Sequence, residues 1–581
     1  MEFIRPFRHG TELSQQERWK LERHPLDVAE AIRERYSRLG PDSIAKVPGE
    51  VERLKWVGLY PQRQGGDAFM LRVKVPGGRL SATQARRIGE LAGELAHGPE
   101  PHPIWGDRYC DITTRQTVQL HWLRIGDIPQ VWDRLAEVGL TTVQACGDSA
   151  RNVSCCPVAG IDADEAFDAS PVAQAISALF TGNREYANLP RKFKISVTGC
   201  LDDCARAEIN DVAMWPARLD DGTLGFNLLV GGGLSDGPRM ASDVDVFVEP
   251  RDAPECARAI AQLYGELGNR ENRGVNRFRY LVQELGPELI RDELEARAAF
   301  ELRPAGEALT RRYRGDHVGV HRQRLASPDG PLQSYVGCSV TVGRITGADL
   351  VEVADLAEAY GDATVRLTAD QNLVLSGVPD DRLDDLLAHE VLGRCSPFPG
   401  PFTRGVVACT GNEFCRFAIV ETKVRAADWA REMDERFADV LGGPEEEVVR
   451  MHFSGCSASC AQPQVADIAF RGETAHVGDS IVEAVDVGLG GGLGPDAAFA
   501  DWVAGAVPVG DVPDAIAAVL HRYLVERRAG EPFRSFVRRL GAEDLAPQLS
   551  TAGVSGRPVP DRDAGARSMG TDERPTTRGP T

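Results

Sequence analysis

ACTGNEFC, residues 408–415, and GCSASCA, residues 455–461, are the stretches on which the interpretation of the whole chain depends. They contribute four thiols, with five residues between the first pair and three between the second: Cys409, Cys415, Cys456 and Cys460. Paired thiolates from distant parts of a chain suit a compact iron–sulfur core with four corners to ligate. Structural zinc sites usually place about two to four residues between their cysteines. The five-residue gap between Cys409 and Cys415 is longer than this, so it favours a [4Fe-4S] cluster. Zinc and unligated core cysteines are the alternatives.

Chain length, net charge and cysteine content limit the kinds of protein that this chain can be. A chain of 581 residues is too long for one core and should form about two to four domains. Its formal charge of −20 makes nucleic acid an unsuitable partner, since polyanion binding needs a basic surface. The first ten residues, MEFIRPFRHG, lack the apolar core of a signal peptide, and no run of about 18 apolar residues follows. We expect a cytoplasmic protein whose thirteen cysteines are metal ligands or core residues rather than disulfides.

An internal repeat organises the chain. TTRQTVQL at 113–120 matches TADQNLVL at 368–375, a shift of 255 residues. KISVTGCLDDCARAEINDVAM at 194–214 matches RMHFSGCSASCAQPQVADIAF at 450–470, a shift of 256, and a GGGL turn occurs in both halves. Two halves with one plan predict a pseudo-twofold enzyme that holds a cofactor at their junction.

Local patterns predict the elements of each half. Residues 28–40 have the rhythm of an amphipathic helix. From Leu54, short alternating runs closed by Pro-Gly turns lead into a helix over 82–96 and a strand over 111–123, as in an α/β half-domain. Residues 268–309 are predicted to be helix and connector. Beyond Leu549 the chain is poor in large apolar residues, which predicts disorder.

The four-cysteine pattern, with ACTGxxFC before it and AIVETK after its first pair, resembles the siroheme-dependent nitrite and sulfite reductases. The resemblance implies an α/β (α+β) fold: an internally duplicated, pseudo-twofold nitrite/sulfite reductase fold with ferredoxin-like half-domains and two siroheme-binding domains. The domains expected on this basis are an N-terminal helical segment (1–50), ferredoxin-like half-domain 1 (51–125), siroheme-binding domain 1 (126–267), a linker (268–310), ferredoxin-like half-domain 2 (311–380), a 4Fe-4S and siroheme-binding domain 2 (381–548) and a disordered tail (549–581).

The resemblance also implies two cofactors, siroheme and a [4Fe-4S] cluster. Cys409, Cys415, Cys456 and Cys460 would ligate the cluster, and Cys460 would also ligate the siroheme iron. Siroheme is edged with carboxylates, so its protein must supply cations within an acidic chain. The matching residues are Arg115, Arg151, Arg191, Lys192 and Lys194, of which Arg115, Arg151, Lys192 and Lys194 are also the expected catalytic, anion-binding set. Strand alternation would place Lys192 and Lys194 on one face.

The implied activity is the assimilatory six-electron reduction of nitrite to ammonia, with ferredoxin as electron donor and a monomeric chain. ACTGNEFC, AIVETK and RNVSCCPVAGID favour the nitrite enzymes. Lys194 and WVGLYPQR favour the alternative, a ferredoxin-dependent sulfite reductase that makes sulfide. A non-catalytic iron–sulfur protein is a more distant alternative.

Two departures from the family pattern lie at or beside cysteines. Ala458 stands where many relatives carry an amide between the last two cysteines. In the repeat, Cys200 and Cys204 match Cys456 and Cys460, and Cys146, Cys155 and Cys156 fall near the places of the first pair. A relic of the duplication, a second cluster, and a zinc or redox site are the alternatives for them. Some related sulfite reductases crosslink a tyrosine to a cysteine, for which Tyr60 with Cys155 or Cys156 is the candidate pair.

Overall fold

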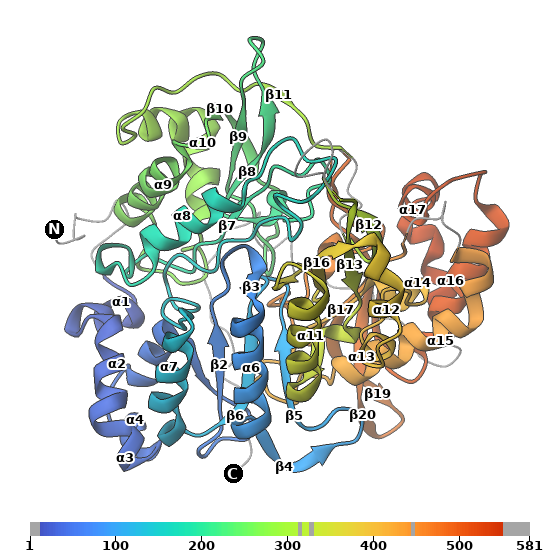
Figure 1. The fold of residues 1–581 in the computed structure, drawn as a ribbon, viewed down its shortest axis with the longest axis horizontal. Helices are drawn as coiled ribbons and strands as arrows, with labels where there is room; N and C mark the ends of the chain where they lie inside the picture. Colours follow the sequence, from blue (N-terminus) through green and yellow to red (C-terminus); the bar gives the residue numbers. More distant parts are fainter. Residues whose placement is uncertain (1–11, 312–315, 325–330, 443–447, 495, 550–581) are drawn as a thin grey trace.

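The computed structural model describes residues 12–311, 316–324, 331–442, 448–494 and 496–549. Within these residues the chain forms four sheets with helices packed on them (Figure 1). The predicted disordered tail lies outside the described residues from 550 onward, whereas Leu549 is the buried last residue of helix α18 (Ala546–Leu549). No described helix is long and apolar enough to cross a bilayer.

The N-terminal segment is helical where the periodicity predicts it. Val28, Ile32 and Tyr36, four residues apart, are all buried and form the inward face. The helix widens by a π turn at Ile32–Tyr36, and the Tyr36 hydroxyl donates a 2.9 Å hydrogen bond to Glu50. The helices of this segment are α1 (Gln15–Glu22), α2 (Val28–Ala31), α3 (Ser37–Leu39), α4 (Asp42–Ala45) and α5 (Glu50–Arg53).

The two central sheets exchange a strand. Strand β14 comes from the second half of the sequence but pairs with β5 of the first, and β3 of the first half pairs with β15 of the second. The two half-domains are therefore interlocked, and they share one hydrophobic core. One sheet has the order β1-β2-β6-β5-β14, with β4 beside β5, and the other has the order β12-β13-β16-β15-β3. The strands are β1 (Leu59–Pro61), β2 (Phe69–Val73), β3 (Arg79–Ser81), β4 (His97–His102), β5 (Gly106–Ile112), β6 (Val118–Leu123), β12 (Gly319–Arg322), β13 (Gln333–Cys338), β14 (Arg344–Thr346), β15 (Thr364–Leu367) and β16 (Leu373–Pro379).

Helices α6 (Ala82–Leu95) and α11 (Gly347–Tyr360) lie side by side over these sheets (Figure 1). Ser81 begins α6 with a capping box, and Thr346 caps α11 through the Asp349 amide. The helices touch through glycines, because a Cβ at Gly89 would lie 2.7 Å from the Gly347 carbonyl oxygen. The other helices around these sheets are α7 (Ile128–Glu137), α12 (Leu383–Leu387) and α13 (Val391–Arg394).

The prediction of one continuous strand over residues 111–123 is wrong. Strand β5 ends at Ile112 and β6 starts at Val118, because Gln116 adopts a left-handed φ of 53° in a turn between them. Gln371 has a φ of 66° in the equivalent turn. Each glutamine side chain reaches the other half: Gln116 donates to the Leu367 carbonyl at 2.9 Å, and Gln371 donates to the Ile112 carbonyl at 3.1 Å.

The two outer sheets repeat a second unit. Their orders are β10-β9-β8-β11, with β7 parallel to β8, and β17-β18-β19-β20-β21, in which the first three strands are parallel. Each has its own core. Their strands are β7 (Ile195–Val197), β8 (Val212–Arg218), β9 (Leu224–Val230), β10 (Ser242–Val248), β11 (Glu307–Ala308), β17 (Val406–Ala408), β18 (Met451–Ser454), β19 (Ile468–Val477), β20 (Ser480–Leu489) and β21 (Asp501–Pro508). The duplicated α+β architecture is confirmed.

Helices of both halves cover the outer sheets (Figure 1). They are α8 (Ser170–Phe180), α9 (Ala253–Leu267), α10 (Phe278–Glu295), α14 (Pro401–Gly405), α15 (Lys423–Leu441), α16 (Val512–Glu526) and α17 (Phe533–Leu540). Helix α10 occupies the predicted connector and is kinked at Gly286, where φ is 79° before Pro287. It packs against β10 and α9, so the connector belongs to the first outer domain.

Candidate functional site

The four predicted cluster cysteines follow neighbouring parallel strands. Cys409 comes directly after β17, and Cys456 and Cys460 follow β18, which pairs with β17 through Ala408 and Phe453. Parallel strands end at the same edge of a sheet, so the two cysteine pairs meet there. The Cys460 thiol acts electrostatically on the thiols of Cys409, Cys415 and Cys456. We call these four residues the four-thiol site.

Backbone amides surround the thiols of this site. The amides of Gly411 and Gly455 donate to the Cys409 sulfur at 3.4 and 3.2 Å. Burial raises the pKa of Cys409 to about 12 and that of Cys456 to about 11, and backbone N–H groups partly offset both increases. Amides aimed at sulfur stabilise a thiolate, which is the form that ligates metal.

Four cations of the first half gather at a second place, and we call Arg115, Arg151, Lys192 and Lys194 the basic cluster. Arg115 lies in the turn between β5 and β6 and donates to Asn210 at 2.6 Å and to Ser154 at 3.2 Å. Lys192 and Lys194 flank Phe193, which is buried against Tyr264 and Phe278, so both lysines lie on the opposite face of the extended segment. All four side chains stay partly exposed.

The electrostatics of the basic cluster favour an anion. Burial, followed by repulsion from Arg277, lowers the pKa of Lys192 to about 7. Burial lowers the pKa of Arg115 to about 9, although Asp211 opposes the shift, and burial with repulsion from Arg115 lowers the pKa of Lys194 well below its usual value. Cations that repel one another at short range lose this penalty when a polyanion binds among them.

The two sites adjoin across the halves of the molecule. The Thr114 hydroxyl, next to Arg115, donates a 3.0 Å hydrogen bond to the Cys460 carbonyl. The Cys460 thiol also acts electrostatically on the Lys192 ammonium group. The thiol site of one half therefore faces the cations of the other.

The sequence profile of the nitrite and sulphite reductase 4Fe-4S domain matches residues 146–302 and 399–553. The profile of the nitrite/sulfite reductase ferredoxin-like half domain matches residues 60–138 and 326–389. The chain belongs to the nitrite and sulfite reductase family. It is an oxidoreductase, its fold is the nitrite/sulfite reductase fold predicted from the sequence, and its family uses siroheme and a [4Fe-4S] cluster.

Several full-length relatives resemble this reductase. An assimilatory ferredoxin-dependent nitrite reductase of Haloferax mediterranei is 41% identical, over 92% of this chain and 93% of its own. A ferredoxin–nitrite reductase of Synechococcus elongatus is 39% identical over 89% and 96%. A sulfite reductase [ferredoxin] 1 of Mycolicibacterium paratuberculosis is 36% identical over 92% and 96%. The solved structure of Mycobacterium tuberculosis NirA matches with a TM-score of 0.83 and 34% identity, over 92% of this chain and 98% of that one.

Arg277 belongs with the basic cluster, and the sequence did not predict this. It lies just before α10 in the expected connector, bonds Asp211 at 3.0 Å and acts on Arg115, Lys192 and Lys194 of the reductase. Its neighbour Arg279 donates to the Leu234 carbonyl of the first GGGL turn, and Arg534 does the same at Leu493 of the second. Arg279 and Arg534 are separated by 255 residues, which is the shift of the internal repeat. This correspondence was the signal in the sequence that the connector is part of the site.

Arg191 lies apart from the other predicted cations of the reductase. Its guanidinium is 3.5 Å from Asp148, which Lys20 and Arg273 also approach. Its positive charge is therefore partly neutralised within the protein, and its contact with siroheme stays a prediction.

The predicted pairing of Tyr60 with Cys155 or Cys156 is wrong in this reductase. The Tyr60 hydroxyl interacts with the thiol of Cys146 instead. Cys156 lies elsewhere, with its sulfur 3.6 Å from the His317 ring. The sequence places three cysteines close together at 146–156, and only the fold separates them.

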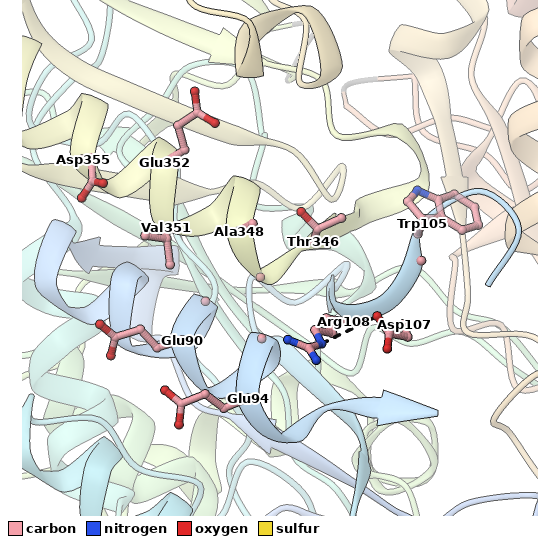
Figure 2. A pocket seen from close by; sticks show the side chains of 14 residues that line it. Glu90, Glu94, Trp105, Asp107, Arg108, Thr346, Ala348, Val351, Glu352 and Asp355 are labelled. Atoms are coloured by element: carbon pink, nitrogen blue, oxygen red, sulfur yellow. Dashed lines mark ion pairs between the residues drawn. The ribbon is translucent and has the colours of Figure 1, made fainter. Parts of the chain in front are cut away.

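A cavity of about 520 Å³ lies between α6 and α11, away from both sites. Figure 2 shows its acidic lining, with Glu90 and Glu94 on α6 and Glu352 and Asp355 on α11. None of the predicted site residues lines it. Its negative charge does not suit the carboxylates of siroheme or an anionic substrate.

Proposed function

We propose that this reductase converts nitrite to ammonia, with six electrons from ferredoxin, at a siroheme coupled to a [4Fe-4S] cluster. The observation that carries the proposal is the meeting of the basic cluster with Cys460. A carboxylate-edged macrocycle needs cations on its rim and a thiolate at its iron, and this junction offers both.

The residues present fit both cofactors. Four thiols with amides directed at sulfur suit a cluster of four irons, for which Cys409, Cys415, Cys456 and Cys460 are the proposed ligands. The mutually repelling cations of the basic cluster suit the carboxylates of siroheme. Cys460 is the proposed ligand shared by both cofactors. Bound there, the two cofactors would supply the one-electron chemistry that the reduction needs.

The basic cluster has two roles in this proposal. Arg115 and Arg151 are held by oxygens of the protein, at Asn210 and at the Gly147 carbonyl, so their orientation is fixed before an anion arrives. Such fixed cations stabilise negative charge on oxygen without reorganising. Burial and repulsion from Arg277 lower the pKa of Lys192 to about 7, and bound carboxylates would raise it again. Lys192 is the proposed proton donor to the departing oxygen.

Nitrite is the proposed substrate, and sulfite is the second candidate. The nitrite reductase of Haloferax mediterranei is 41% identical, whereas the sulfite reductase of Mycolicibacterium paratuberculosis is 36% identical. Lys194 is the observation that favours sulfite, because a further cation suits a dianion. A cytoplasmic location and a monomeric state belong to the same proposal and rest on the sequence.

Steady-state kinetics on both anions test the substrate. With reduced ferredoxin or methyl viologen as donor, kcat/KM for nitrite to ammonia is expected to exceed that for sulfite to sulfide. A clear preference for sulfite overturns the choice of substrate while leaving the cofactors in place. A chain with a cluster but without siroheme absorption would instead be a non-catalytic iron–sulfur protein.

A further inference from the structure

Three cysteines of the first half converge with a histidine at the entry to the second half, away from the four-thiol site. The sulfurs of Cys156, Cys200 and Cys204 and a ring nitrogen of His317 all lie within 4.8 Å of one another. We call these residues the Cys3His group. Cys200 and Cys204 are in the loop after β7, and His317 lies just before β12. The three thiols are at most 2% exposed.

The ligand types and spacing fit a single tetrahedral ion. Three cysteines and one histidine form one of the common structural zinc sets, and Cys200 and Cys204 have the short spacing of such sites. With zinc–sulfur bonds of about 2.3 Å, neighbouring ligand atoms of a tetrahedron lie roughly 3.7 Å apart. The Cys156 sulfur lies 3.6 Å from the His317 Nε2 atom.

The same distances disfavour a second four-iron cluster. Each thiolate of a [4Fe-4S] cluster binds a different iron, so its sulfurs lie about 6 Å apart. The Cys3His group would have to expand beyond its 4.8 Å spread to hold one. Its fourth ligand is also an imidazole, whereas such clusters usually take four cysteines.

Neighbouring groups orient the ligands. Tyr335, which is buried, lies 3.3 Å from Nδ1 of His317, and an Nδ1–H directed at this hydroxyl leaves the lone pair of Nε2 facing Cys156. The Asp202 amide donates to the Cys200 sulfur at 3.4 Å. Both contacts are of the kind that surrounds protein-bound metals.

The backbone at His317 is also specialised. His317 has a left-handed φ of 52°, an uncommon conformation that the surrounding structure must hold. Its carbonyl lies against Gly337 of β13, where an added Cβ would be 1.7 Å from the oxygen. The close approach, permitted by glycine, directs the imidazole toward the three thiols.

We propose that the Cys3His group binds one structural Zn²⁺ ion. Four protein ligands leave no open position for substrate, so the ion has a structural role. It fastens His317, at the entry to the second half, to two loops of the first. This inference does not depend on the substrate or on the cofactors proposed above.

Metal analysis of the intact, anaerobically purified holoenzyme tests the inference. We expect about one zinc per chain that survives gel filtration with a mild chelator. Zinc X-ray absorption is expected to show three sulfurs at about 2.3 Å and one nitrogen at about 2.0 Å. A chain without zinc overturns the proposal, and so does extra iron and sulfide equal to a second cluster.

Two variants give an independent result. His317→Ala removes a partly exposed side chain and is expected to speed zinc loss to a chelator at least about tenfold, while the siroheme and cluster absorption stay unchanged. Cys256→Ser, a buried thiol of α9 outside the Cys3His group, is the control and should keep its zinc. Equal zinc retention in both variants contradicts the site, and if neither variant folds, the wild-type measurement decides.

Discussion

Cys200 and Cys204 occupy the same places in the repeat as Cys456 and Cys460, yet the surroundings of the two pairs differ. The first pair is almost fully buried and lies with Cys156 and His317. In the second pair, Cys456 is partly exposed and Cys460 is exposed and adjoins Lys192. The same loop in the two halves thus holds two kinds of thiol site. The kind of site depends on the neighbouring residues, which are Cys156 and His317 in the first half and Lys192 beside the second pair.

The cations differ between the halves in the same way. Asp370 stands at the repeat position of Arg115 and binds Arg206 at 2.5 Å, and Val448 stands at the position of Lys192. In the second half, the places of Arg115 and Lys192 thus carry an acid and an apolar residue, whereas Arg450 keeps a cation at the place of Lys194. The comparison teaches that the duplication preserved the backbone, while most of the cations come from one half and the proposed cluster ligands from the other.

The largest expected difference in activity is between serine substitutions at two equivalent cysteines, Cys460 and Cys204. Cys460→Ser should lower nitrite reduction by more than about 100-fold, since even changes outside the ligand shell of a metal cost about 10–100-fold. Cys204→Ser should keep the siroheme bands and activity within about threefold. Turnover assays and iron determination on both variants measure this. Loss of iron from a folded Cys204→Ser variant, together with a wild-type chain that holds no zinc, would place a second cluster in the first half.

Lys194 is expected to separate the two substrates. Near neutral pH part of the sulfite is a dianion, whereas nitrite is a monoanion, so removing one cation should weaken sulfite binding more. Lys194→Asn is predicted to lower kcat/KM for sulfite about tenfold or more, about 1.4 kcal/mol, and for nitrite by clearly less. Lys46→Asn, at an exposed site of the N-terminal segment, is the control. Equal losses for both anions would remove Lys194 from the specificity argument.

The pKa of Lys192 predicts a pH dependence. Burial and repulsion from Arg277 lower the pKa of this lysine to about 7, so it is a cation below pH 7 and loses its charge as pH rises. Bound siroheme carboxylates would raise this pKa, so in the loaded enzyme the charge is lost at pH 7 or above. KM for nitrite should therefore rise in that range. Lys192→Arg keeps the charge, and its KM should stay flat over this range. An identical pH profile in both proteins would assign the ionisation to another group.

Substituting either of the two turn glutamines, Gln116 and Gln371, is expected to have the smallest effect, a loss of stability of similar size in both halves. Gln116→Leu removes the hydrogen bonds to the carbonyls of Leu367 and Cys155. Gln371→Leu removes those to the carbonyls of Ile112 and Ala408. Each should cost about 1–3 kcal/mol of stability. Thermal unfolding of both variants tests this, and a large difference between them would show that the halves are not structurally equivalent.

Much of this molecule could be predicted from its sequence because the repeat carries both pattern and register. The shift of about 255 residues predicted the pseudo-twofold duplication, the family resemblance implied its α+β fold, and the paired spacing grouped the cysteines from Cys409 to Cys460. The basic cluster followed from a resemblance, since an arginine such as Arg115 in isolation is an ordinary ion-pair partner.

The remaining features depend on three-dimensional contacts. The exchange of β3 and β14 between sheets leaves no local signal, because either pairing satisfies the same strand pattern. His317 joins Cys200 from more than a hundred residues away, and Tyr60 reaches Cys146 rather than Cys155. Such pairings follow from packing of distant segments, and spacing along the chain does not encode them.

Iron and acid-labile sulfide in the anaerobically purified chain test most directly the central claim that the chemistry is divided between the halves. One [4Fe-4S] cluster and one siroheme predict about five irons and four sulfides per chain. About nine irons and eight sulfides would show that the thiols of the first half hold a second cluster, which would contradict the division.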